Sequence, residues 1–299
     1  MKRSQSSIKE RAIVALIKVS GYSTIVFVLL ILFFLLRNGV GALVKVPSGD
    51  LFGTRWYPIE EYYGLLPLIF GSLLITLAAT VIAVPVGVIT AVYIAEIAPP
   101  WARNSLKPVV EVLGGVPSVV LGFLGILFYA NLLREALYLP TGLTAFTGAT
   151  LLALISIPPI VSISEDALDA VPRSYRDAAL ALGATQWQTI WRVTLPAARS
   201  GVLTAIMLGI GRTIGETMVV LMVTGNAPVM PSGLGALFSP VRTMTATIAA
   251  EMGEVASGSV HYEVLFFIGI VLFLISLAIN LTASAFIFRQ RKRSERILS

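Results

Sequence analysis

Long apolar segments alternate with short polar ones along most of the chain. Six segments approach or exceed the roughly 20 residues that a helix needs to cross the hydrocarbon core of a membrane. They cover residues 21–36, 65–94, 108–132, 146–163, 202–223 and 264–288. The second and the sixth exceed one crossing, so we expect these helices to tilt or to extend beyond the bilayer. The pattern predicts an all-α membrane protein with six transmembrane helices.

The composition favours a membrane protein over a soluble one. Of the 299 residues, 56% are hydrophobic and only 13% are charged, whereas soluble domains carry about 25% charged residues. The chain has no cysteine, which excludes disulfides, cysteine nucleophiles and cysteine-ligated metals. We interpret the net charge of +6 as a property of the loops and not as a sign of nucleic-acid binding.

The first apolar segment follows a basic stretch, as the apolar part of a secretory signal peptide does. The sequence Arg-Asn-Gly follows it in place of a small-residue cleavage site, so we expect a retained membrane helix. The chain then divides into a basic N-terminal segment, residues 1–20, a six-helix domain, residues 21–288, and a basic tail, residues 289–299.

Lysine and arginine residues indicate the orientation of the spans. If both termini are cytoplasmic, the inside segments hold 16 of these residues and the outside loops hold five, with Arg212 left in the membrane. This is the bias that the positive-inside rule describes. We therefore expect both termini on the cytoplasmic side.

Two predicted outside loops, residues 38–64 and 226–262, are longer than a simple connection needs. In the second, Ser239 and Pro240 form a helix-start signal that predicts a short helix over residues 241–252. This helix is either an interfacial or partly re-entrant helix or an ordinary surface helix. The first loop has four aromatic residues suited to the membrane interface: Trp56, Tyr57, Tyr62 and Tyr63. In and directly after the second loop we expect four titratable side chains to be mainly solvated, with contact to an external protein as the alternative: Glu251, Glu254, His261 and Glu263.

Prolines occur within three predicted spans. They are Pro85, Pro117, Pro158 and Pro159. Each removes a backbone donor and kinks or breaks its helix, which a membrane tolerates where other protein or water satisfies the freed carbonyl groups. Such breaks suit a bundle around a pathway, although they also occur in membrane proteins that have none.

The inside loop, residues 164–201, contains a regular polar stretch. Helix-forming residues precede Gly183 and a second helical pattern follows it, so two short helices should meet there in a projecting elbow. The spacing resembles the EAA signature of membrane subunits of ATP-binding-cassette (ABC) importers, in which this loop docks on the cytoplasmic ATPase. The matching residues are Asp177, Ala178, Ala179, Gly183, Val193, Leu195 and Pro196. Asp177 stands where the signature has glutamate, and Val193 where it has isoleucine.

The chain has no ATP-binding motif of its own. It lacks a G-x-x-x-x-G-K-[ST] phosphate loop, and Gly209, Gly211 and Gly215 miss the G-x-G-x-x-G pattern because Ile214 occupies the place of the third glycine. We therefore expect no enzymatic activity, metal or cofactor on this chain, and expect ATP and Mg²⁺ to bind a separate ATPase subunit.

Arg212 and Glu216 place two charges inside the fifth apolar segment. Residues four apart share one face of a helix, and such charges normally face a bundle interior or a watery cavity. Gly211 and Gly215 would form an adjacent face for close helix packing. The pair is either an internal ion pair that fixes packing or part of an anion pathway. In the pathway interpretation, the forked guanidinium binds an oxyanion and Glu216 competes for it.

The sequence around Arg212 is similar to that of oxyanion importers. Its R-x-x-G-E pattern resembles importers of phosphate, sulfate and molybdate, and the longer GRTIGETMVVLMVTGN and GGVPSVVLGFLG stretches resemble phosphate-specific ones. The first outside loop resembles that of their C-type permease subunit. The resemblance implies a type I importer fold in a prokaryotic cytoplasmic membrane. It also implies an A-type permease partner, two ATPase subunits and an external phosphate-binding protein.

Three other functions were weighed against an inorganic phosphate permease. A sulfate or molybdate permease is disfavoured because GETM, and not GEFG, follows the arginine. An ion-coupled transporter would leave the elbow unexplained. An intramembrane enzyme is disfavoured because His261 has no H-E-x-x-H partner and no intramembrane carboxylate pair or nucleophile elbow is present.

Overall fold

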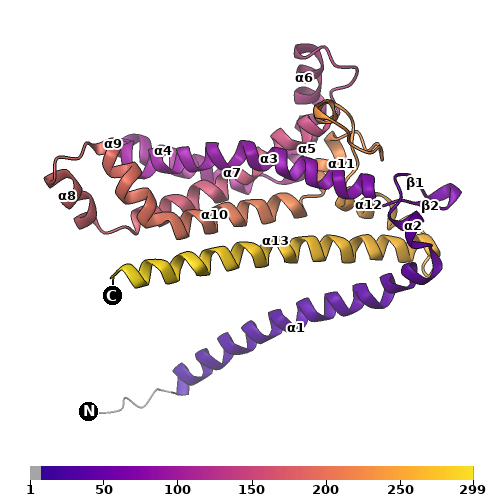
Figure 1. The fold of residues 1–299 in the computed structure, drawn as a ribbon, viewed down its shortest axis with the longest axis horizontal. Coiled ribbons are helices and arrows are strands. Elements are labelled where there is room, and N and C mark those ends of the chain that lie inside the picture. The colour runs from indigo at the N-terminus through magenta and orange to yellow at the C-terminus, as the bar shows by residue number, and fades with distance from the viewer. Residues whose placement is uncertain (1–7, 299) are drawn as a thin grey trace.

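The chain forms a bundle of long helices with short helices and a small β-hairpin at its ends (Figure 1). This computed structural model describes residues 8–298. Its helices are α1 (Ile8–Lys45), α2 (Ser48–Leu51), α3 (Leu66–Val92), α4 (Pro100–Gly115), α5 (Ser118–Leu124), α6 (Ala130–Ala136), α7 (Ala145–Asp169), α8 (Arg173–Ala181), α9 (Gln186–Thr189), α10 (Leu195–Gly215), α11 (Met218–Val223), α12 (Met244–Glu251) and α13 (Val260–Leu298). Two strands, β1 (Trp56–Tyr57) and β2 (Tyr62–Tyr63), pair antiparallel. Short π and 3-10 segments are η1 (Pro58–Glu60), η2 (Tyr93–Ile97), η3 (Gly125–Tyr129), η4 (Ile190–Thr194) and η5 (Leu234–Phe238).

Six helical stretches of the described chain are long and apolar enough to cross a membrane. They are Ala12–Lys45, Leu66–Ile97, Ser118–Ala136, Ala145–Asp169, Gln186–Gly215 and Val260–Thr282. The predicted number of spans is therefore confirmed. The first helix extends beyond its predicted span at both ends, and the second span runs 32 residues because η2 continues α3.

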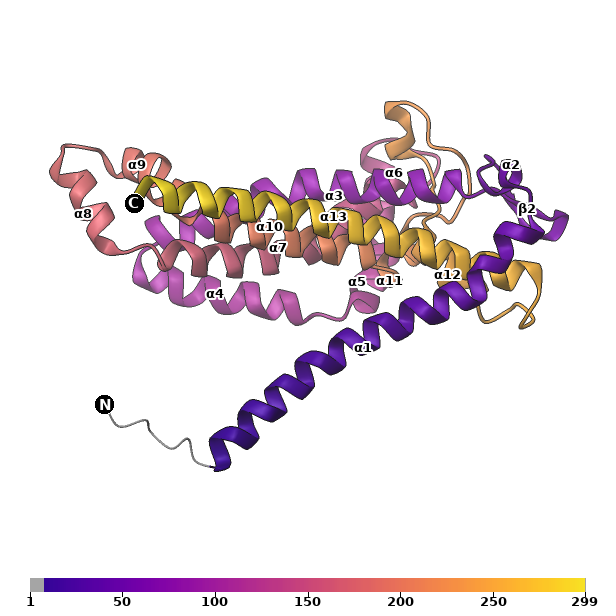
Figure 2. The same cartoon turned by 60° about the horizontal axis from the view of Figure 1, so that its bottom comes forward.

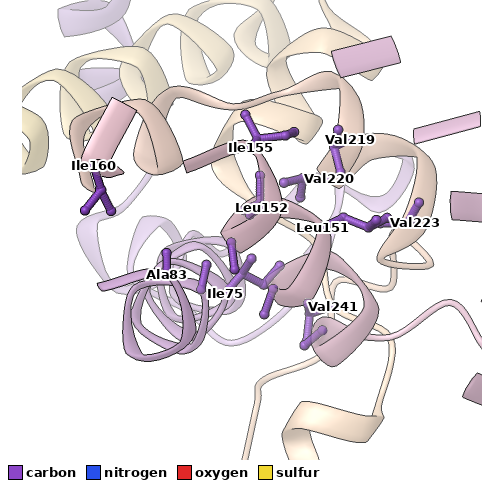
Figure 3. Close-up of a cluster of buried hydrophobic side chains, with 14 residues drawn as sticks. Ile75, Ala83, Leu151, Leu152, Ile155, Ile160, Val219, Val220, Val223 and Val241 are labelled. Carbon is purple, nitrogen blue, oxygen red and sulfur yellow. The ribbon is translucent and has the colours of Figure 1, made fainter. Parts of the chain in front are cut away.

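Helix α7 is the centre of the bundle. It packs most extensively against α3 and α10, and 61% of its most apolar window is buried. Figure 3 shows Leu151, Leu152 and Ile155 of α7 facing α3 side chains such as Ile75 and the valines of α11. A helix that is apolar on most sides is suited to such a central position.

The third span is shorter than predicted, because α4 forms a separate helix before it. Val116 is extended, with ψ 126°, and Pro117 stands just before α5. Proline disfavours helical geometry in the residue that precedes it, so the break falls at this point. The expected span of residues 108–132 is corrected to Ser118–Ala136. Pro85, Pro158 and Pro159, by contrast, lie inside helices that remain continuous.

Charged side chains attach α4 to the end of α7. Lys107 Nζ lies 3.2 Å and Arg103 Nη2 3.3 Å from carboxylate oxygens of Glu165, which is 1% exposed. Further ion pairs join Arg103 to Asp169 and Lys107 to Asp166. Burial alone would lower the pKa of Lys107, but its hydrogen bond to Glu165 and the charges of Glu165 and Asp166 raise this pKa above its usual value.

Helix α1 contacts the bundle along only part of its length. Its C-terminal part packs on α13, where Phe34 and Phe266 meet edge to face at 5.5 Å between ring centroids and Gly39 lies against the α13 backbone. Towards Ile8 the helix diverges from all other elements (Figure 2). Its most apolar window is entirely unburied.

The two ends of the bundle differ in structure. At one end lie α8, α9, the Ile8 end of α1 and the Leu298 end of α13, and we call it the elbow end (Figures 1 and 2). The other, the hairpin end, carries β1, β2 and α12. Trp56 and Tyr63 are buried in the hairpin, so these two aromatic residues are part of its core and do not face a membrane interface as predicted.

The helix of the second long loop begins later than predicted. Val241 forms an isolated bridge to Gly225, and its N–H donates to Thr224 O at 2.9 Å. This pairing holds the chain extended, so Thr243 caps α12 and the helix starts at Met244. The Ser239-Pro240 signal was overridden by this bridge between two parts of the chain.

Four titratable groups of this loop and the start of α13 were expected to be solvated. Three are instead paired: Glu251 with Arg242 at 2.6 Å and with His261 at 2.8 Å, and Glu263 with Lys45 at 2.6 Å. Trp56 Nε1 also donates to Glu251 at 3.1 Å. The pairs tie the hairpin end together.

We predict that Gly201→Ala destabilises the bundle. A Cβ at this position of α10 would overlap Ala167 Cβ of α7, and overpacking costs about 1–3 kcal/mol. Thermal unfolding of the purified chain in detergent measures the loss. Gly211→Ala in the same helix is the matched control, because a Cβ there meets nothing within 4 Å. Equal stability of the two variants would contradict the tight α7–α10 contact.

Candidate functional site

The predicted fifth span, residues 202–223, is interrupted next to its charged residues. Helix α10 ends at Gly215, and Glu216 adopts an extended conformation with ψ 127° before α11 begins at Met218. Arg212 is therefore in the last turn of one helix, while Glu216 lies in the connection to the next. The expectation that both residues share one helical face is wrong.

The carboxylate of Glu216 binds backbone groups of the residues that directly follow it. Its Oε1 accepts hydrogen bonds from the backbone N–H groups of Thr217 at 3.2 Å and Met218 at 3.1 Å. These are unpaired donors at the start of α11, which a nearby carboxylate stabilises. Within the described part of the chain, Glu216 forms no ion pair with Arg212.

Arg212 lies on an open face of α10. Its side chain is exposed, and a Cβ built at either Gly211 or Gly215 would meet no atom within 4 Å. The predicted close packing through these glycines is therefore not made with any described part of the chain. Gly209 packs instead, with its Cβ position 2.6 Å from Ile160 Cγ1 of α7. The open face leaves the guanidinium free to meet a ligand or another subunit.

Hydroxyl groups from α3, α10 and the start of α12 gather next to the break at Glu216. They surround a void of about 10 Å³ together with Glu216, and they belong to Ser72, Thr76, Thr213, Thr243 and Thr245. Thr213 is bonded to Ser156 at 2.7 Å and to Gly209 O at 3.0 Å. This cluster was not predictable from the sequence, because its members are far apart in the chain. In the sequence, these residues are recognisable only as single serine or threonine residues in largely apolar stretches.

The predicted elbow is present at the elbow end of the bundle. Helix α8 is followed by Gly183, whose φ of +83° lies in the left-handed region that favours glycine. Thr185 and Gln188 then form a capping box at the start of α9. On α8, Asp177 and Ala178 are exposed and Ala179 is buried. The elbow thus presents one side of α8 outward.

The remaining residues of the signature connect the elbow to α10. Val193 lies in η4, and Leu195 and Pro196 form the first turn of α10. Proline is tolerated there because the first turn has no use for its N–H group. One nearly continuous helical path therefore leads from the elbow to Arg212.

Glu96 and Arg176 hold the elbow in place, and the sequence analysis missed them. Arg176 Nη2 lies 2.6 Å from Glu96 Oε1, and Arg176 also donates to the carbonyl oxygens of Leu168 and Val171. Gln186 Nε2 of α9 donates to Glu96 O at 3.1 Å. A cavity of about 670 Å³ lies beside these contacts. The only sign of this contact in the sequence is the position of Glu96 directly after the second apolar segment.

Among the residues that the structure describes, no three His, Asp or Glu side chains are grouped so that they could hold a metal ion. The site presents an exposed guanidinium, a carboxylate held by backbone donors and a group of hydroxyls.

Comparisons with characterised proteins place the chain among transport proteins. It is 39% identical to a probable ABC transporter permease protein of Bacillus subtilis, over 81% of this chain and 76% of that protein. It is 33% identical to a phosphate transport system permease protein, PstC, of Pasteurella multocida, over 88% of this chain and 89% of the other. The corresponding protein of Mesorhizobium japonicum is also 33% identical, over 80% and 78%.

Solved structures confirm the predicted fold. A bacterial ABC transporter involved in alginate import matches with a TM-score of 0.61 and 16% identity, over 94% of this chain and 98% of that one. The MetNI methionine ABC transporter in an inward-facing conformation matches with a TM-score of 0.57 and 18% identity, over 79% and 99%. At these identities the likeness concerns the fold, which is that of type I ABC-importer permeases.

The family assignment rests on most of the chain. The model of the binding-protein-dependent transport system inner membrane component matches residues 83–294, a range that includes the elbow, Arg212 and Glu216. Its members work with an ATPase and a binding protein. The chain therefore belongs to the family of binding-protein-dependent transport system inner membrane components, a multi-pass membrane protein of the ABC-importer permease class.

Proposed function

We propose that this chain is the C-type permease subunit of an importer that moves inorganic phosphate across the cytoplasmic membrane of a prokaryote. The observation that carries the proposal is the open face of α10, on which Arg212 is exposed beside two unpacked glycines. The similarity to phosphate permeases over most of the chain supports phosphate as the cargo. On this proposal the chain itself has no enzymatic activity.

Arg212 and Glu216 have separate roles in the proposed pathway. The forked donors of a guanidinium match a tetrahedral oxyanion. Because Glu216 is held by the backbone of α11, it leaves Arg212 available and does not compete for it in this conformation. An anion that enters a negative cell interior is opposed by about 2.3 kcal/mol per charge per 100 mV. Import therefore needs an energy source.

That source is a pair of separate ATPase subunits that bind ATP and Mg²⁺, while this chain binds no cofactor. Asp177 and Ala178 on the exposed side of α8 are placed to contact an ATPase subunit. The path from Val193 through Leu195 and Pro196 to Arg212 would transmit movement of the elbow along α10. The two permeases form a heterodimer of C-type and A-type chains.

We place the elbow end in the cytoplasm and the hairpin end outside, where the phosphate-binding protein docks. Both described ends of the chain, at Ile8 and Leu298, lie at the elbow end (Figures 1 and 2). The 16 lysine and arginine residues of the predicted inside segments support this orientation. Membrane lipid surrounds the six spans. The proposed partners include no nucleic acid.

Replacement of Arg212 by alanine is expected to reduce phosphate uptake roughly 10- to 100-fold, the range that corresponds to the loss of hydrogen bonds to a charged group. The assay is uptake of labelled phosphate by the reconstituted importer. Arg212→Lys keeps the charge but loses the forked donors, so its uptake rate should lie between those of the unmodified importer and the alanine variant. Arg134→Ala on α6 is the control for an exposed arginine elsewhere. Normal uptake by the alanine variant, with complex assembly intact, would remove Arg212 from the pathway.

Gly183→Val is expected to uncouple ATP hydrolysis from transport. A β-branched residue is strained at a φ of +83°, so the angle between α8 and α9 should change. Gly183→Asn should retain coupling, because asparagine tolerates the left-handed region. The measurement is the ratio of phosphate moved to ATP hydrolysed. An unchanged ratio in the valine variant would count against the elbow as the coupling element.

The cargo itself is tested by competition. We expect excess unlabelled phosphate to suppress uptake of labelled phosphate into liposomes that contain the full importer, with sulfate and molybdate ineffective at the same concentration. The binding protein is present in every arm. Strong competition by sulfate or molybdate would instead favour a permease for those oxyanions.

A further inference from the structure

Helix α12 links the hairpin end of the bundle to the break in the fifth span. It packs against α11, α3 and α13, and its first turn is buried at Met244, Thr245, Ala246 and Thr247. Figure 1 shows it between the hairpin and α11. It is therefore a helix that contacts both an end of the molecule and the proposed transport site.

The break exposes backbone groups that must be satisfied inside the membrane. An unpaired carbonyl or N–H group costs several kcal/mol in hydrocarbon. Two side chains of the break pair with nearby backbone groups. The Glu216 carboxylate accepts hydrogen bonds from two backbone N–H groups at the start of α11, and Thr217 Oγ1 donates to Gly215 O at 3.3 Å. The carbonyl oxygen of Glu216 needs a donor from elsewhere.

Thr245 supplies that donor. Its Oγ1 donates to Glu216 O at 3.2 Å, across 29 positions of the chain. The side chain is only 9% exposed, so water has little access to replace it. Thr243 Oγ1, which lies 3.2 Å from Thr245 Oγ1, also accepts from Ala246 N and caps α12.

Both ends of α12 are fixed to other elements, so the position of Thr245 is well determined. At its start, Met244 N donates to Ser72 Oγ of α3 at 2.9 Å, and Gly71 of α3 has no room for a Cβ beside Arg242 O. At its end, Glu251 is bonded to Arg242, Trp56 and His261. A movement of the hairpin end would therefore reach Thr245 through α12.

We propose that Thr245 is a positioning residue for the transport site: its hydroxyl holds the backbone of the break and thereby sets where Arg212 and Glu216 lie. The inference rests on the proposed function of these two residues. Arg212 is four residues before the carbonyl that Thr245 holds, so a change in the path of the break changes the end of α10 that carries it. Thr245 thus connects the external end of the permease to the place where the anion passes.

The test uses the complete importer in liposomes. The concentration of phosphate-loaded binding protein is raised stepwise to saturation, so that kcat and KM are both measured. Thr245→Val removes the hydroxyl but keeps the shape, and Thr245→Ser keeps the hydroxyl. Thr247→Val is the matched control, since Thr247 is also buried in α12 but its hydroxyl donates to Thr243 O, four residues earlier, at 2.8 Å. Rates are expressed per assembled complex.

We expect Thr245→Val to lower kcat about three- to tenfold, the factor that one lost hydrogen bond produces, while KM for the loaded binding protein stays unchanged. Thr245→Ser should restore at least half of the rate, and Thr247→Val should match the unmodified importer. This split separates positioning inside the membrane from docking outside it.

Three results would overturn the inference. An unchanged kcat in Thr245→Val would show that the hydroxyl has no role in transport, and an equal loss in Thr247→Val would show a general effect on folding. A raised KM with unchanged kcat would place Thr245 in docking. The unmodified importer tests the proposed function separately: if it moves another oxyanion, the variant ratios are measured with that anion.

Discussion

Every backbone N–H and carbonyl group inside a membrane has to find a partner in the protein, and this constraint governs the bundle. Continuous helices meet it largely within themselves, although Pro158 and Pro159 of α7 lack the N–H groups that would pair with two carbonyl groups one turn earlier. The break between α10 and α11 cannot, so it uses a carboxylate, two threonine hydroxyls and a neighbouring helix. Side-chain hydrogen bonds at the break thus replace part of the backbone pairing that a continuous helix would provide.

The helical path from the elbow to the break carries the two features that we propose for transport. Its elbow, held by Glu96 and Arg176, lies at one end, and the exposed Arg212 lies near the other. Packing of α10 on α7 through Gly201 and Gly209 leaves little space between these helices. Displacement of the elbow is therefore more easily passed along α10 than absorbed by a loose interface, since packed cores transmit strain.

Hydropathy and one motif were sufficient to predict the six spans and the elbow, because both depend on local sequence. The helix boundaries near functional residues were not predictable in this way. Glu216 has no local helix-breaking neighbour except Gly215, and its extended backbone is held by Thr245, which is remote in sequence. The start of α12 likewise depends on the bridge of Val241 to Gly225. Periodicity within a window carries no information about such contacts.

Helix α1 is pinned at one end and free at the other. The Phe34–Phe266 contact and the close approach at Gly39 join it to α13, while its Ile8 end stands apart from the bundle (Figure 2). Membrane helices accommodate a change in bilayer thickness by tilting. In lipids of different chain length, α1 can therefore change its tilt relative to α13 by turning about these contacts. The packing of the helices around α7 stays unchanged.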